Sequence, residues 1–171
     1  MIHVCSLARV AATVEATGAK RVVSLVNAGT PMTMPAHVAG EAHLFLPIND
    51  IVAAADGMTL PGEAHVAALF AWLEAWDRAD PIVVHCFAGV SRSTAAAYSA
   101  VLALDPGRDE EELALELRRK SPTATPNARI VAVADALLGR GGRMVRAIGS
   151  IGRGEDCFEG VPFALELARR G

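Results

Sequence analysis

Four short apolar runs, which alternate with stretches of helical periodicity, place the strongest constraint on how this chain can fold. The runs are rich in Val, Ile and Leu and cover residues 2–5, 21–26, 43–48 and 81–86. The last three are almost continuously apolar, which is typical of strands that are covered on both faces. Strands that alternate with helices indicate an α/β domain with a largely parallel central sheet. We therefore expect four to five strands flanked by helices.

The intervals between these runs carry helical signals. The first helical pattern spans residues 6–17, with Ser6 as a candidate N-cap and Gly18 just past its end. A helix is also expected to begin near Ser91 or Arg92, directly after the fourth apolar run. The other expected helices cover residues 60–79, 109–120 and 125–139.

The whole chain, residues 1–171, is expected to form one domain. Its length suits a single core of ordinary size, and it contains no internal repeat, low-complexity tract or linker. Beyond Gly139 the sequence is punctuated by Gly and Arg. We expect residues 139–171 to form a C-terminal helical extension packed on the domain, with a short helix, a loop and a terminal helix.

Composition excludes several classes of partner. The formal net charge is −3, which gives no general attraction to nucleic acids or to anionic membranes. No apolar stretch is long enough to span a membrane, and the N-terminus lacks the features of a signal peptide, so we expect a cytoplasmic protein. The three cysteines are far apart in sequence and form no C-x-x-C pair, so neither a disulfide framework nor a metal site is expected.

The segment HCFAGVSRS, residues 85–93, carries the chemistry. It places the Cys86 thiol at the carboxyl end of an expected buried strand, where open α/β sheets bind their ligands. Backbone N–H groups from Phe87 to Arg92 can curl around an anion at the start of the following helix, and Gly89 permits the turn. The Arg92 guanidinium suits two oxygens of a phosphate. These positive groups should favour the thiolate of Cys86, so the loop is expected to bind a phosphate and aim a nucleophile at its phosphorus.

This segment resembles the active-site signature of the protein tyrosine phosphatase superfamily, and it is most similar to the dual-specificity branch, His-Cys-x-x-Gly-x-Ser-Arg-Ser. The resemblance extends over roughly residues 22–138, including LPINDI at 46–51 and SPTATPNARIV at 121–131. It implies that Cys86 is the nucleophile, that the Ser93 hydroxyl helps the Cys86 sulfur to leave phosphorus, and that Asp50 is the general acid. The implied phosphate cradle consists of Phe87, Ala88, Gly89, Val90, Ser91 and Arg92.

The implied activity is a cysteine-dependent hydrolysis of phosphate monoesters through a cysteinyl-phosphate, with no metal and no other cofactor. The variable loop positions Phe87, Ala88 and Val90 are uncharged. This favours phosphorylated proteins or small aryl phosphates over polyphosphorylated lipid head groups. Phosphotyrosine is the expected target, with phosphoserine and phosphothreonine as further candidates.

Several alternatives stay open at this point. Asp56 competes with Asp50 as the acid, because both belong to the same connection, although Asp56-Gly57 also has the pattern of a turn. Cys5 could form a protective disulfide with an oxidised Cys86 or could simply pack at a strand end. His85 is expected to order the loop rather than to act as a base. The alternative functions are a phosphate-binding module without catalysis and a rhodanese-type sulfurtransferase.

Overall fold

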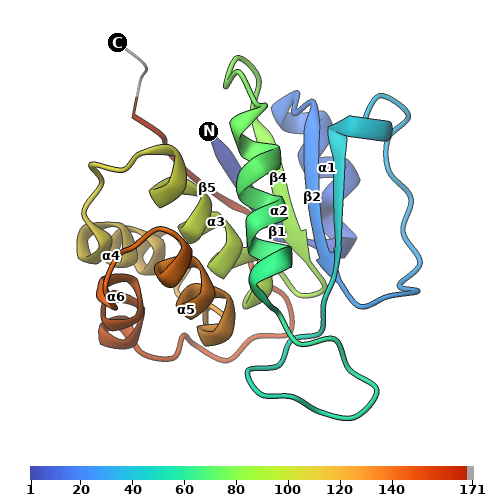
Figure 1. The fold of residues 1–171 in the computed structure, drawn as a ribbon. Coiled ribbons are helices and arrows are strands. Elements are labelled where there is room, and N and C mark those ends of the chain that lie inside the picture. Colours follow the sequence, from blue (N-terminus) through green and yellow to red (C-terminus); the bar gives the residue numbers. More distant parts are fainter. Residues whose placement is uncertain (169–171) are drawn as a thin grey trace.

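In the computed structural model, which describes residues 1–168, a five-stranded sheet lies between two helical layers (Figure 1). The strand order is β3-β2-β4-β1-β5. The first four strands are parallel, and β5 runs antiparallel to β1. These findings confirm the expected α/β class and the largely parallel sheet. The strands are β1 (Ile2–Ser6), β2 (Arg21–Val26), β3 (His43–Pro47), β4 (Ile82–Cys86) and β5 (Phe163–Leu165).

The central strand is β4, which pairs with β2 on one side and with β1 on the other. All five of its residues are buried, as its continuous apolar sequence predicts. Its side chains alternate between the two helical layers, with Val83 in the smaller core cluster and Val84 in the larger one. The loop that follows Cys86 therefore starts at the middle of the carboxyl edge of the sheet.

The two helical layers differ in size. On one face, α1 (Val10–Thr17) covers the smaller cluster after a short 3₁₀ turn at Leu7–Arg9. On the other face, α3 (Arg92–Leu104) packs against β1, β2 and β4, and the remaining helices gather around α3 (Figure 1). These helices are α2 (Glu63–Glu74), α4 (Glu110–Lys120), α5 (Ala128–Leu137) and α6 (Arg143–Ile151).

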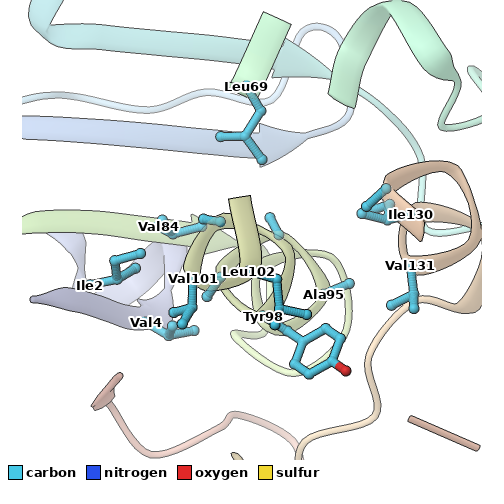
Figure 2. Packing of buried hydrophobic residues seen from close by; sticks show 14 of the residues in the cluster. Ile2, Val4, Leu69, Val84, Ala95, Tyr98, Val101, Leu102, Ile130 and Val131 are labelled. Atoms are coloured by element: carbon cyan, nitrogen blue, oxygen red, sulfur yellow. The ribbon is translucent and has the colours of Figure 1, made fainter. Parts of the chain in front are cut away.

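Helix α3 is the centre of the larger core, and it is buried on all sides for most of its length. Its run of small residues, Ala95 to Ala97 and Ala100, is fully buried, which lets neighbouring backbones approach closely. Figure 2 shows Tyr98, Val101 and Leu102 among residues from the sheet and from α5. The Tyr98 hydroxyl donates to the carbonyl oxygen of Glu110 at 3.0 Å, so this buried polar group is satisfied.

The C-terminal extension differs from the expectation. Its short helix is present as α6, but the expected terminal helix is wrong, because Phe163–Leu165 form the strand β5. In this register Val4 pairs with Phe163 and Ile2 with Leu165. The reason is that β1 would otherwise be an edge strand, and β5 satisfies its exposed N–H and C=O groups. Residues 169–171 of the extension lie outside the described residues.

Two helix starts also differ from the sequence pattern. The helix expected from residue 125 begins at Ala128, because Asn127 is its N-cap and accepts hydrogen bonds from the N–H groups of Arg129 and Ile130. Ser6 makes no side-chain cap, and its hydroxyl instead donates to Glu159. Within residues 1–168, none of the helices has the length and apolar character needed to cross a bilayer.

Candidate active site

The loop from Cys86 to Arg92 joins β4 to α3 and turns sharply at Gly89. Gly89 has φ of 73°, a conformation that residues with a side chain rarely adopt. A Cβ atom there would lie 2.8 Å from the backbone nitrogen of Ser6, so the loop passes directly over the end of β1. The turn requires glycine, as the sequence predicts, and the close approach to β1 requires it as well.

The loop carbonyls point outward and are held by three surrounding segments. The N–H of Leu7 donates to Phe87 O at 3.1 Å, and the N–H of Gly160 donates to Ala88 O at 2.9 Å. On the other side, Val90 O accepts from the N–H of Thr125 at 3.0 Å, and Ser91 O accepts from the N–H of Asn127 at 3.2 Å. A trans peptide plane directs its N–H opposite to its C=O. The N–H groups that follow these carbonyls are therefore turned toward the inside of the loop, which is the arrangement an anion nest needs.

The Cys86 sulfur lies inside this loop. Its Sγ accepts a hydrogen bond from the N–H of Gly89 at 3.3 Å, and it lies 3.1 Å from the hydroxyl oxygen of Ser93. The residue is buried, with 2% of its surface exposed. The Gly89 amide and the Ser93 hydroxyl therefore both face the sulfur. The structure thus brings together Cys86, Ser93 and the Gly89 amide, as the resemblance implies.

Arg92 is the first residue of α3, and its side chain folds back toward the carboxyl edge of the sheet. Its Nη1 donates to the carbonyl oxygen of Ile48 and to Oδ1 of Asn27, each at 2.9 Å. Its Nε is buried and has no hydrogen-bond partner among the described residues. A buried guanidinium with an unused donor is costly unless a ligand engages it. Asn27 was not singled out by the sequence, because an Asn at the end of an apolar strand also suits an ordinary turn.

The carboxylate of Asp50 contacts the same loop. Its Oδ1 accepts a hydrogen bond from the Ser91 hydroxyl at 2.7 Å and another from the Asn127 side-chain amide at 2.8 Å. Asp56 is exposed, lies at the turn where the N–H of Met58 donates to Ala55 O, and has no hydrogen bond to the loop. The structure therefore places Asp50, and not Asp56, beside the cradle. Asn127 was expected only as part of a helix start, yet it also joins Asp50 to the cradle.

A chain of hydrogen bonds within the sheet contacts the loop at its first residue, Cys86. Nδ1 of His85 lies 3.4 Å from the carbonyl oxygen of Cys86, and because a carbonyl can only accept, Nδ1 carries the proton. Nε2 of His85 then accepts from the Ser24 hydroxyl at 2.6 Å, and the Ser24 oxygen accepts from Nε2 of His43 at 2.7 Å. Burial lowers the pKa of His85 to about 4, so the ring is neutral near pH 7. His85 orders the loop and does not reach the sulfur.

The second buried thiol, Cys5, has a different environment. It is 1% exposed and belongs to the smaller core cluster, whereas Cys86 belongs to the larger one on the opposite face of the sheet. Burial raises the pKa of Cys5 to about 11, so this thiol stays protonated. These observations favour packing over a disulfide as the role of Cys5.

A segment that the sequence did not connect with the site lies on the other flank of the loop. Gly160 donates to Ala88, and a Cβ atom at this glycine would lie 2.8 Å from the carbonyl oxygen of Gly89. The neighbouring Glu159 accepts from Ser6 and lies 3.4 Å from Nε of Arg9. We call residues 157–161 the C-terminal strap. In Figure 1 the strap and the connection carrying Asp50 both approach the lower end of the sheet.

Among the described residues, no group of three or more His, Cys, Asp or Glu side chains is arranged to hold a metal ion. The positive groups at the site come from the chain itself. They are the Arg92 side chain and the inward N–H groups at the start of α3.

No protein-family model matches this chain, and no curated protein matches it at a significant level. Solved structures do resemble it. Human DUSP28 is 21% identical with a TM-score of 0.63, covering 81% of this chain and 88% of that one. A mouse putative dual specificity phosphatase in complex with zinc tungstate is 22% identical with a TM-score of 0.61, covering 84% of each chain. The Yvh1 phosphatase domain from Chaetomium thermophilum is 17% identical with a TM-score of 0.57, covering 84% of this chain and 93% of that one. In its sheet, its helical layers and its loop between β4 and α3, this chain has the fold of dual-specificity phosphatases.

Proposed function

We propose that the protein is a cysteine-dependent phosphatase that hydrolyses phosphate monoesters. The observation that carries this proposal is the convergence of three groups on one loop. The Cys86 sulfur lies among donors, the buried Arg92 Nε has no partner in the described chain, and the Asp50 carboxylate is bonded to Ser91 of the loop. A nucleophile, an oxyanion clamp and an acid at one point are what phosphoryl transfer through a covalent intermediate requires.

In the first step, the Cys86 thiolate attacks phosphorus in line with the leaving oxygen. The sulfur–phosphorus bond forms as the ester bond breaks, and a protonated Asp50 gives its proton to the leaving alcohol or phenol. Both hydrogen bonds to Asp50 use Oδ1, so the carboxyl is held while Oδ2 can reach the substrate. The negative charge on the equatorial oxygens meets the inward N–H groups and Arg92, so the step itself calls for no metal.

In the second step, water attacks the phosphorus of the cysteinyl-phosphate. The Asp50 carboxylate now takes a proton from this water, and the sulfur–phosphorus bond breaks to release inorganic phosphate. The Ser93 hydroxyl, 3.1 Å from the sulfur, can donate to the departing thiolate. The cycle ends with Cys86 and Asp50 in their starting states, so protons and charge balance.

The proposed substrates are phosphorylated proteins or small aryl phosphates, with phosphotyrosine first. Phe87, Ala88 and Val90 bring no cation to the loop, which disfavours head groups with several phosphates. The mouse neighbour was solved with zinc tungstate, and tungstate is a tetrahedral oxyanion like phosphate. We expect such oxyanions to occupy the loop of this chain as well.

The test is the hydrolysis of 4-nitrophenyl phosphate in the presence of a metal chelator, with and without vanadate. We expect turnover that the chelator leaves intact and that vanadate blocks. The Cys86→Ser variant should lose turnover yet still bind phosphate, because the nest and Arg92 remain. Turnover that requires added metal would contradict the mechanism. Phosphate binding without any turnover would identify a binding module instead, and cyanide-dependent sulfur transfer would identify a sulfurtransferase.

A further inference from the structure

An apolar pocket lies beside the phosphate cradle, between the cradle and the C-terminal strap. Its volume is about 310 Å³. The walls are formed by Leu7, Ala8, Phe87, Ala88 and Phe158, and its polar end by Ser6 and Glu159. The larger hollow that contains Asp50 shares none of these residues. The two hollows therefore lie on different flanks of the same loop.

The pocket carries two exposed aromatic rings. Phe158 is fully exposed, and Phe87 is 65% exposed. Large apolar side chains that gather at a hollow, rather than being scattered singly, mark a binding surface. Covering either ring by a ligand removes apolar area from water and stabilises the complex.

The wall formed by the strap is held in place before any ligand arrives. Gly160 donates to Ala88 O at 2.9 Å, and Glu159 accepts from Ser6 and pairs with Arg9. Phe158 precedes these two anchored residues directly. The backbone of this wall is thus preformed, which lowers the entropic cost of binding.

The pocket adjoins the cradle, because Phe87 and Ala88 belong to both. Their carbonyls are fixed at the cradle, and the same residues line the pocket. Consecutive residues of a peptide are about 3.8 Å apart, so the residues next to a bound phosphorylated residue lie at the surface beside the cradle. The occupant should be apolar to suit the walls, and Glu159 at the polar end should repel acidic groups.

We propose that this pocket receives an apolar side chain of a phosphopeptide, one or two residues from the phosphorylated residue, and that Glu159 selects against acidic residues there. This inference rests on the proposed function, because it takes the cradle to hold the substrate's phosphate. It assigns substrate selection to Phe158 and Glu159 of the strap, outside the catalytic groups.

The test measures binding to the full chain carrying Cys86→Ser, so that no substrate is consumed. Fluorescent phosphotyrosine peptides carry a single Leu, Gly or Glu at one of the two positions before or after the phosphotyrosine, and binding is followed by anisotropy. We expect Leu at one position to tighten binding roughly tenfold over Gly, which is within the range for burying one apolar side chain. Glu at that position should bind more weakly than Gly.

The added Phe158→Ala change should remove most of the Leu preference. The matched control is Val161→Ala, because Val161 is also exposed in the strap but does not line the pocket. This control should keep the preference. The added Glu159→Gln change should abolish the discrimination against Glu, provided that the melting temperature is unchanged. In the wild-type background, Phe158→Ala should leave 4-nitrophenyl phosphate turnover unaltered.

A Leu preference that is absent, or that survives Phe158→Ala, would overturn the inference. Self-association in sedimentation that Phe158→Ala abolishes, without any peptide preference, would assign the pocket to a second copy of this chain and would also overturn it. If the Leu preference holds but the wild type turns over no aryl phosphate, the pocket stands and the proposed hydrolysis falls.

Discussion

The two flanks of the phosphate cradle are held in different ways. On the acid flank, the backbone N–H groups of Thr125 and Asn127 hold loop carbonyls, and side chains add further contacts, with Asp50 bonded to Ser91 and to Asn127. On the strap flank, the direct contacts to the loop are made by backbone, with the N–H groups of Leu7 and Gly160 donating to loop carbonyls. The side chain proposed to transfer protons therefore lies on one flank, and the other flank fixes the conformation of the loop. A change of the acid should act on turnover, whereas a change where the strap backbone meets the loop, at Gly160, should act on the geometry of the loop.

The largest effect is expected on the acid flank. Asp50→Asn should slow turnover by roughly 100- to 10,000-fold, the usual contribution of general acid–base catalysis, with phosphate binding retained. The defect should grow with the pKa of the leaving group, because an alkoxide needs the proton more than nitrophenolate does. Steady-state kinetics with a series of aryl and alkyl phosphates measures this trend.

Asp56→Asn is the matched control, since Asp56 lies on the same connection but has no hydrogen bond to the loop. It should change turnover little. If Asp56→Asn carried the larger defect and its dependence on the leaving group, the assignment of the acid to Asp50 would be wrong.

A smaller effect is expected on the strap flank. Gly160→Ala would put a Cβ atom 2.8 Å from the carbonyl oxygen of Gly89, so the strap or the loop must move. Overpacking of this kind costs about 1–3 kcal/mol of stability, and a displaced catalytic loop can lose up to about 100-fold in turnover. Unlike the Asp50 defect, this loss should be the same for good and poor leaving groups.

The control for this change is Gly149→Ala in α6, where a Cβ atom would meet nothing within 4 Å. Alanine in a helix should hold or raise the stability of the protein. Thermal melting and kinetics of both variants test the prediction. Normal turnover by a well-folded Gly160→Ala would show that the strap does not brace the loop.

The smallest effect concerns the base of the loop, which neither flank touches. The pKa of His85 is lowered to about 4 from the ordinary 6.5 because the ring is buried. Between these two pH values the unfolded chain therefore binds a proton at His85 that the folded chain does not bind. The contribution of His85 to the free energy of unfolding is therefore fully present above pH 6.5 and is lost as the pH falls toward 4. Between pH 7 and pH 5 the loss is about 2 kcal/mol. Burial also lowers the pKa values of His3 and His43, which adds to the loss in the same direction.

Urea unfolding at the two pH values measures this slope. His85→Gln should flatten it, while His37→Gln, at an exposed position, should not. An unchanged slope in His85→Gln would indicate that other groups cause the acid sensitivity.

The contrast between the flanks also explains what the sequence could predict. The strand pattern and the loop HCFAGVSRS were sufficient for the α/β class and for the position of the loop after the central strand β4. Cys86, Gly89 and Arg92 could be singled out because each has a residue type that its proposed role demands. Asp50 was accessible through the family resemblance, and the structure places it beside Ser91.

The strap flank was not predictable, because backbone groups carry no residue-specific signal. Gly160 bonds to Ala88 through its N–H, which any residue except Pro has, and only the close packing requires glycine. The segment of Phe163–Leu165 was expected to belong to a terminal helix. The open edge of β1 overrode that propensity, and such a long-range pairing has no local sequence signature.

The most direct test of the account is to find which atom holds the phosphoryl group during turnover. Ser93→Ala should slow the departure of the Cys86 thiolate, so the intermediate should accumulate when this variant is mixed with ³²P-labelled phosphotyrosine peptide and quenched in denaturant within milliseconds. The account predicts label on the peptide that contains Cys86, in an amount approaching one per chain, and none in Cys86→Ser. Turnover without label on Cys86, or label on another residue, would contradict the claim that this thiol is the nucleophile.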